Sequence, residues 1–392
     1  MSFNALSFIP STSSSKVVLL AAIGTFIGCG KPHHESSTKS VEIPQTVIKS
    51  QGSVGFCWSY ATIGFLESLA LKNTGLTLDL SEEALGFYRM AEELNALSRK
   101  FKAEDLSTPE QVEQKVFEGL EGWDVTFNPH YNPNLPVKNA MQLIETYGTV
   151  PESAWSYKFT SGAQLDKFMT HVFTGFAGLM KSQGQGKVTR DMIFELLGSA
   201  EAYGSIPPKE FDFLAPNGKT KKYSSIDFAS DYIGFSKDDY TYMIPDAQIG
   251  YDQLVSAMKL TLERGLNVPF SYIIFKNSFD SWDGSYSMDK IGQETPVAAG
   301  GHAVLVTDFI NKGGRPGKIS DENLKIEMSK ASSELDFLII KNSWGTDIQS
   351  PIVQLPGYHV IRQNYVRELS KTNTNISIVV PRDIAFKVRY QN

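Results

Sequence analysis

The chain has 392 residues, enough for two or three domains or for one large domain. Apolar residues make up 41% and charged residues 20%, an ordinary globular balance that excludes a disordered chain, a coiled coil and a collagen. With 37 basic and 43 acidic side chains the net charge is −6, so the sequence lacks a basic nucleic-acid footprint. Its two cysteines, Cys29 and Cys57, exclude a disulfide framework.

The first expected element is an export leader. Residues 17–28 form an uncharged apolar run that is shorter than the roughly 20 residues of a membrane-spanning helix, and Lys16 precedes it. The small residue Gly28 is followed by Cys29, an arrangement that resembles the lipobox of bacterial lipoproteins. The resemblance implies cleavage before Cys29 and acylation of its thiol. A plain secretory signal with a stray cysteine is the alternative.

The leader sets the expected beginning of the mature chain. Residues 1–28 are interpreted as a signal peptide, and 29–45 as the lipidated Cys29 with a polar tether. The expected location is the cell envelope of a bacterium, with the lipid as the contact to the membrane. Gly30 lacks the acidic side chain that often marks retention at the inner membrane, so the outer membrane is favoured.

The N-terminal part of the mature chain is predicted to be helical. After Cys57, apolar residues recur at spacings of three and four, which predicts a buried helix that ends before Gly75. Cys57 therefore stands at or next to a helix N-terminus. A second helix is predicted to begin at Ser81, whose hydroxyl can cap it, and to run to about residue 97.

The rest of the chain changes character. The middle, 160–235, is rich in chain breakers around an apolar helical stretch at 189–200 and is interpreted as an insertion or small subdomain. Residues 251–264 predict a helix, and four short β-rich runs follow it. These runs are 268–275, 302–309, 335–342 and 357–363. The fold class is therefore α+β, with a helical part at 46–159, a β-rich part at 236–392 that fits a mixed barrel or sheet, and a ligand cleft between them.

Cys57 has the surroundings of a nucleophile. A helix N-terminus favours a thiolate over a thiol. Gly52 and Gly55 let backbone N–H groups approach a bound carbonyl group, and Gln51 can bring a side-chain amide to the same place. This pattern favours a nucleophile beside an oxyanion hole. The alternative is an inert buried cysteine.

A thiol nucleophile needs a proton partner, and His302 is the best candidate. It follows a pair of glycines and leads an apolar strand, so its ring can reach out of the end of a sheet. Asn342 follows another apolar strand and can orient the imidazole, while Trp344 can shield their hydrogen bond from water. His130 is the next candidate for the base.

Three segments carry a family resemblance. QGSVGFCW at 51–58, GHAV at 301–304 and KNSWG at 341–345 are similar to the active-site segments of papain-like cysteine proteases, in the same order. The resemblance covers most of 45–365 and implies a two-lobed papain-like fold, helical in the first lobe and barrel-like in the second. It also implies catalysis without a metal or cofactor.

The resemblance assigns a role to each matched residue. Cys57 becomes the nucleophile, His302 the general acid and base, and Asn342 the residue that orients His302. Gln51 and the backbone N–H of Cys57 form the oxyanion hole. The resemblance also implies four substrate-binding residues: Gly122, Trp123, Trp58 and Trp344. Gly122 and Trp123 stand where the family has a pair of glycines that bind the substrate backbone.

Some features depart from the family pattern. Cys57 and His302 are much further apart in sequence than the ~130–150 residues expected for the family. The glycine pair is at best half kept, because Glu121 precedes Gly122.

The predicted function is hydrolysis of peptide bonds in a polypeptide substrate, through a thiolate–imidazolium pair and an acyl-enzyme. Acyl transfer to an amine and a non-catalytic binding module are the alternatives. Because Cys57, His302, Asn342 and Gln51 occur together, the enzyme is favoured over the binding module. The sequence leaves the oligomeric state and the side-chain specificity open.

Overall fold

The structure is a computed structural model, and all of its described residues belong to the unit Lys39–Asn392. It describes residues 43, 45–52, 55–118, 136–157, 159, 161–215, 218–292, 295–311, 335–347, 350, 352–353, 355–373 and 375–390. Residues 1–42 therefore lie outside the description, and with them the predicted leader, Cys29 and most of the tether. The mixture of helices and strands confirms the predicted α+β class.

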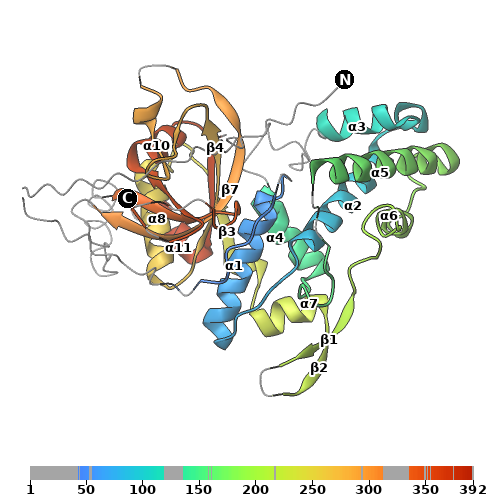
Figure 1. The fold of residues 1–392 in the computed structure, drawn as a ribbon, viewed down its shortest axis with the longest axis horizontal. Helices are drawn as coiled ribbons and strands as arrows, with labels where there is room; N and C mark the ends of the chain where they lie inside the picture. The colour runs from blue at the N-terminus through green and yellow to red at the C-terminus, as the bar shows by residue number, and fades with distance from the viewer. Residues whose placement is uncertain are drawn as a thin grey trace, which may run out of the picture. The chain divides into compact units, whose positions relative to one another are not determined.

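The helices come mainly from the first two thirds of the described chain (Figure 1). The α-helices are α1 (Cys57–Thr74), α2 (Glu82–Lys100), α3 (Pro109–Glu118), α4 (Pro136–Tyr147), α5 (Gly162–Gln183), α6 (Arg190–Leu197), α7 (Ser225–Asp227), α8 (Tyr251–Glu263), α10 (Gln363–Leu369) and α11 (Arg382–Tyr390). The short 3₁₀ or π turns are η1 (Ala103–Leu106), η2 (Phe228–Ile233), η3 (Lys237–Asp239) and η4 (Met288–Lys290).

The strands form a small hairpin and one large sheet. They are β1 (Glu210–Leu214), β2 (Thr220–Ser224), β3 (Tyr240–Met243), β4 (Val268–Phe275), β5 (Phe279–Asp280), β6 (Ser285–Tyr286), β7 (Ala298–Asn311), β8 (Leu335–Lys341), β9 (Tyr358–Arg362) and β10 (Ile376–Pro381). The large sheet has the order β3-β10-β4-β7-β8-β9-β6-β5, and all of its neighbouring pairs are antiparallel except the parallel pair β6–β9.

The sheet corrects one detail of the predicted architecture. Its edge strands, β3 and β5, do not pair with each other, so the described strands form an open sheet and no closed barrel. The four predicted β-rich runs all become neighbouring strands, β4, β7, β8 and β9, in the centre of this sheet.

Helix α1 has the predicted bounds. It begins at Cys57 and ends before Gly75, which adopts a left-handed φ of 75° and donates its N–H to the Leu71 carbonyl. Glycine suits this cap because it carries no Cβ. Helix α2 follows Ser81 as expected, but the Ser81 side chain makes no capping hydrogen bond within the described residues, so the predicted hydroxyl cap is wrong.

The helical stretch predicted at 189–200 becomes α6, and the rest of the segment 160–235 is more regular than the sequence predicts. The segment contains the 22-residue helix α5, the helix α6 and the hairpin β1–β2. Phe168, Val172 and Phe176 bury one face of α5, which packs against α3. That this segment is an insertion into the fold stays a prediction.

Strand β7 lies between two apolar cores. Its residues Ala303 and Leu305 belong to the core that the N-terminal helices build, while Val304 and Val306 belong to the core between the sheet, α8, α10 and α11. The alternation follows from the two-residue period of a strand. Helix α1 packs against β7 and β4 on one side and against α2 and α4 on the other (Figure 1).

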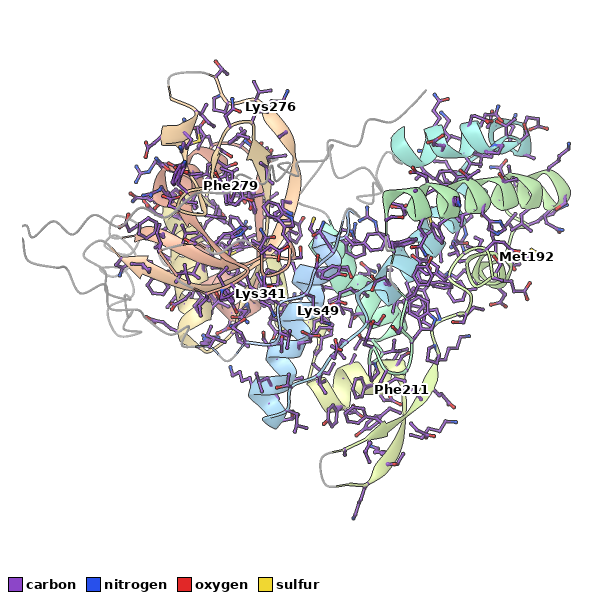
Figure 2. The ribbon with its side chains drawn as sticks, viewed as in Figure 1. Lys49, Met192, Phe211, Lys276, Phe279 and Lys341 are labelled. Atoms are coloured by element: carbon purple, nitrogen blue, oxygen red, sulfur yellow. The ribbon has the colours of Figure 1, made fainter. Side chains whose placement is uncertain are left out.

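The interior of both cores is filled by large side chains, which Figure 2 shows on the ribbon. Among the helices of the described residues, none is both long enough and apolar enough to cross a bilayer.

Candidate active site

The Cys57 thiol lies at the first residue of α1 and is 7% exposed. The backbone N–H of Ala303, the residue after His302, donates a hydrogen bond to the sulfur. Burial raises the pKa of Cys57 to about 11, although the N–H groups of Ala303, Trp58 and Cys57 itself oppose the rise. The thiol is therefore neutral in this buried state, and the helix N-terminus alone does not ionise it.

The His302 imidazole lies on β7, opposite Tyr272 of β4. Its Nε2–H donates to Asn342 Oδ1 over 2.9 Å, because an amide oxygen can only accept. The Trp344 ring stacks on the imidazole with 4.9 Å between the ring centroids. Burial lowers the pKa of His302 to about 4, and the Asn342 hydrogen bond only partly opposes this. With the proton on Nε2, a neutral His302 keeps the lone pair of Nδ1 for proton transfer.

Asn342 directly follows β8 and joins three groups. Its Oδ1 accepts the N–H of Ser343 over 2.8 Å in addition to the His302 proton. Its Nδ2–H donates to His359 Nδ1 over 3.0 Å. Sequence analysis missed His359, which lies on β9 in register with Ile340 of β8. A histidine within an otherwise apolar strand was the available signal.

Gln51 lies beside the residue that follows Asn342. Its backbone N–H donates to the Ser343 carbonyl over 2.8 Å, and the Ser343 hydroxyl donates to Gln51 Oε1. The neighbouring Ser50 forms an isolated antiparallel bridge with Trp344. The structure therefore holds the Gln51 segment against the segment that carries Asn342.

The predicted substrate-binding residues differ in their surroundings. Trp58 is 3% exposed, and the Arg89 guanidinium lies 4.9 Å from the centre of its ring, so Trp58 packs inside the helical core. Trp344 is half-buried against His302. Gly122 and Trp123 lie outside the described residues.

Two other histidines were compared with His302, of which one lies outside the described residues and the other is held by a residue elsewhere. His130 lies outside the description, and His171 on α5 pairs its Nε2 with the Ser199 hydroxyl over 3.0 Å.

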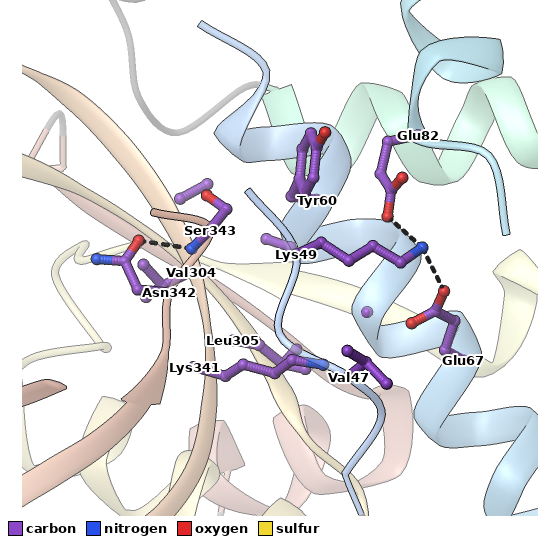
Figure 3. A pocket seen from close by; sticks show the side chains of 13 residues that line it. Val47, Lys49, Tyr60, Glu67, Glu82, Val304, Leu305, Lys341, Asn342 and Ser343 are labelled. Carbon is purple, nitrogen blue, oxygen red and sulfur yellow. Dashed lines mark hydrogen bonds and ion pairs between the residues drawn. The ribbon is translucent and has the colours of Figure 1, made fainter. Parts of the chain in front are cut away.

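A half-buried lysine holds the chain just before Gln51. Lys49 Nζ lies 2.8 Å from Glu67 Oε1 of α1 and 2.7 Å from Glu82 Oε1 of α2, as Figure 3 shows. It also reaches Asp79 Oδ1 over 2.7 Å. Burial lowers the pKa of Lys49, but the carboxylates outweigh burial and hold the pKa above its ordinary value.

A second lysine connects the chain just before Asn342 to the same cluster. Lys341 Nζ donates to the Thr46 carbonyl over 3.0 Å and to Thr46 Oγ1 over 2.8 Å, and Thr46 Oγ1 donates to Glu67 Oε2 over 2.8 Å. Burial lowers the pKa of Lys341 to about 8. The cluster borders a small cavity of about 20 Å³, which has room for one water molecule.

One acidic cluster has the composition of a hard-cation site. Within the described residues, Glu82, Glu83 and Glu152 each bring a carboxylate oxygen within 4.8 Å of the others. Lys49 Nζ already lies 2.7 Å from Glu82 Oε1, and burial raises the pKa of Glu82 to about 8 although Lys49 opposes this rise. The three acids belong to α2 and to the turn after α4, not to the elements that carry Cys57 and His302, so we assign no cation to this cluster.

The comparisons with known proteins support the architecture. No protein-family model matches the sequence, and no curated protein matches it. The fold is similar to that of PepW from Lactobacillus rhamnosis HN001, with a TM-score of 0.56 and 15% identity over 90% of this chain and 84% of that chain.

Two further solved structures match with lower TM-scores. Xylellain, a cysteine protease from Xylella fastidiosa, gives 0.37 at 14% identity over 86% of this chain and 84% of that chain. The bromelain protease from Ananas comosus, in complex with the E64 inhibitor, gives 0.38 at 13% identity over 86% and 93%.

Proposed function

We propose that the protein is a papain-like cysteine peptidase with Cys57 as its nucleophile. The observation that carries this proposal is the hydrogen bond from His302 Nε2–H to Asn342 Oδ1 under the Trp344 ring. It leaves Nδ1 of the imidazole for the thiol, whose sulfur accepts the N–H of the adjacent Ala303. The likeness of the fold to PepW agrees with this proposal.

The reaction is acyl transfer in two halves. His302 Nδ1 takes the thiol proton while the sulfur attacks the peptide carbonyl carbon. The Cys57 N–H and the Gln51 side chain support the oxyanion. His302 then gives its proton to the leaving amine, the C–N bond breaks, and a thioester remains. Water adds to the thioester with His302 as base, and the acid product leaves the restored thiol.

The protonation states favour proton transfer during attack. Burial raises the pKa of the Cys57 thiol and lowers that of the His302 imidazole, so the resting pair is neutral. The thiolate–imidazolium pair that the sequence predicts then forms after substrate binds. The bound substrate excludes solvent water from the site, and the peptide dipoles assist the charge separation.

The test is adduct mapping with a peptidyl epoxysuccinyl inhibitor. In a Cys29→Ser chain, Cys57 is the only cysteine, and mass spectrometry should find one inhibitor on Cys57. The Cys57→Ser chain is the matched control, and it should neither be labelled nor hydrolyse peptides.

The result separates the alternatives. If the folded chain cleaves no peptide and its Cys57 does not react, the result would favour a binding module over the proposed peptidase. Peptide ligation in place of hydrolysis, with the same labelling, would identify an acyl transferase that uses an amine acceptor.

We also propose that Cys29 carries a lipid that anchors the mature chain in the bacterial envelope. The support is the apolar run at 17–28 and the cysteine that follows Gly28. Expression in a Gram-negative host with an alkyne fatty acid should label the wild-type chain and the Cys57→Ser control. Cys29→Ala should lose the label, and a labelled Cys29→Ala chain would contradict the proposal.

A further inference from the structure

His359 is a buried imidazole that the proposed reaction does not use. It is 1% exposed and lies on β9, beside the end of β8. The rings of Phe279 and Trp344 surround it, with centroids 5.5 Å and 5.6 Å from its own. Within the part of the chain that the structure describes, its side chain makes one hydrogen bond, between Nδ1 and Asn342 Nδ2, over 3.0 Å. His359 and His302 therefore flank the same carboxamide group.

The donors and acceptors around Asn342 define one orientation of its carboxamide. The Ser343 N–H and the His302 Nε2–H are both donors, and both point at Oδ1. The Nδ2 group carries only hydrogen atoms to donate, so His359 Nδ1 must offer a lone pair. His359 is thus the neutral Nε2–H tautomer.

A rotated carboxamide would place its NH₂ group against the Ser343 N–H, which can only donate. It would keep the other two hydrogen bonds only if His302 and His359 both changed tautomer. Buried polar groups left in this way are costly, so His359 strengthens the preference for the observed orientation. If position 359 offered no acceptor, only the hydrogen bond from the Ser343 N–H would oppose rotation of the Asn342 carboxamide among the groups described around it.

We propose that His359 is a positioning residue for the candidate active site: it holds the Asn342 carboxamide and, through it, the Nε2–H tautomer of His302. This proposal rests on the proposed peptidase function for its kinetic consequence. His359 does not touch the reacting atoms, and it acts through Asn342 alone. Its effect is on the fraction of molecules in which His302 Nδ1 is ready to accept the thiol proton.

The kinetic test compares two substitutions in the full chain. His359→Leu removes the acceptor and should lower kcat about tenfold with KM within about twofold, equivalent to about 1.4 kcal/mol in the barrier. His359→Asn places an amide oxygen where Nδ1 lies and should restore kcat to within about threefold of the wild type. His171→Leu removes a hydrogen-bonded histidine from α5 and should leave kcat unchanged.

Two kinetic results would overturn the proposal. One is a His359→Leu enzyme that keeps the wild-type kcat. The other is a His359→Asn enzyme that is as slow as a folded His359→Leu enzyme, because packing rather than the acceptor would then explain the loss.

A spectroscopic test does not need activity or the leucine variant. In the Cys57→Ser chain with ¹⁵N-labelled histidine, long-range ¹H–¹⁵N spectra distinguish protons on Nδ1 from protons on Nε2. Both His302 and His359 should carry the proton on Nε2, with the His359 signals assigned by their loss in His359→Asn. A proton on His359 Nδ1 at neutral pH would overturn the inference. An inactive wild-type chain with the expected tautomers would refute the peptidase while leaving the positioning of Asn342 intact.

Discussion

Substitution of Lys49 by methionine tests how the Gln51 segment is held. Lys49 Nζ lies 2.8 Å from Glu67 Oε1 and 2.7 Å from Glu82 Oε1, and both carboxylate side chains are 2% exposed. Methionine has a similar length but no charge, so two buried carboxylates lose their shared cation. Breaking a buried ion pair from one side costs about 3–5 kcal/mol. We expect the free energy of unfolding to fall by that amount.

Urea unfolding followed by tryptophan fluorescence measures this loss against a matched surface pair. Lys237 and Glu145 are 2.6 Å apart, but their side chains are 38% and 44% exposed. Lys237→Met should therefore cost less than about 1 kcal/mol. Because Glu82 is one of the two partners left buried, Lys49→Met with Glu82→Gln should be less destabilised than the sum of the single changes. A Lys49→Met chain that loses no more stability than Lys237→Met would refute the reasoning.

Two further predictions concern stability. Burial lowers the pKa values of His302 and His359 to about 4, so both stay neutral in the folded state at neutral pH. The free energy of unfolding is therefore highest above pH ~6.5, the ordinary pKa of histidine, and falls as the pH drops towards 4. The expected loss is about 3 kcal/mol for each imidazole. Urea midpoints from pH 7 to 4 should fall less in His359→Asn than in the wild type, and equal falls would contradict this. Gly148→Ala should cost at least ~3 kcal/mol, because its φ is 75° and a Cβ there would lie 2.0 Å from the Ser225 backbone carbon. Gly75→Ala has the same φ and open space, so it should cost only ~1 kcal/mol in a thermal unfolding comparison, and similar losses for both would refute the steric argument.

Local sequence patterns predicted several of the helices and strands. The bounds of α1 and of β4 agree with the sequence prediction, because the helical spacing before Gly75 and the short β-rich run at 268–275 are both local patterns. Helix α5 was missed although Phe168, Val172 and Phe176 repeat at helical spacing, since the breakers around it drew the interpretation towards loops. β7 begins four residues before the predicted run, at Ala298, because alanine and glycine carry little β signal.

The open sheet and the full site depend on contacts that are distant in sequence. Whether β3 pairs with β5 or ends the sheet is decided by the packing of the whole chain. The sequence placed His302 and Asn342 as partners through a family resemblance, and the structure brings them together. For His359 it offered only a histidine on a predicted strand, because the bond of His359 to Asn342 depends on the register of β8 with β9.

The strand that carries His302 also ties the two cores into one cooperative unit. Ala303 and Leu305 reach into one core while Val304 and Val306 reach into the other, so neither interior can melt without exposing a face of β7. Partial unfolding that keeps one core intact is therefore expected to be rare, and heat should abolish the tertiary structure of both cores in a single transition. Such coupling means that each chain holds either His302 in its folded setting or an unfolded β7, with few half-folded molecules between these two states.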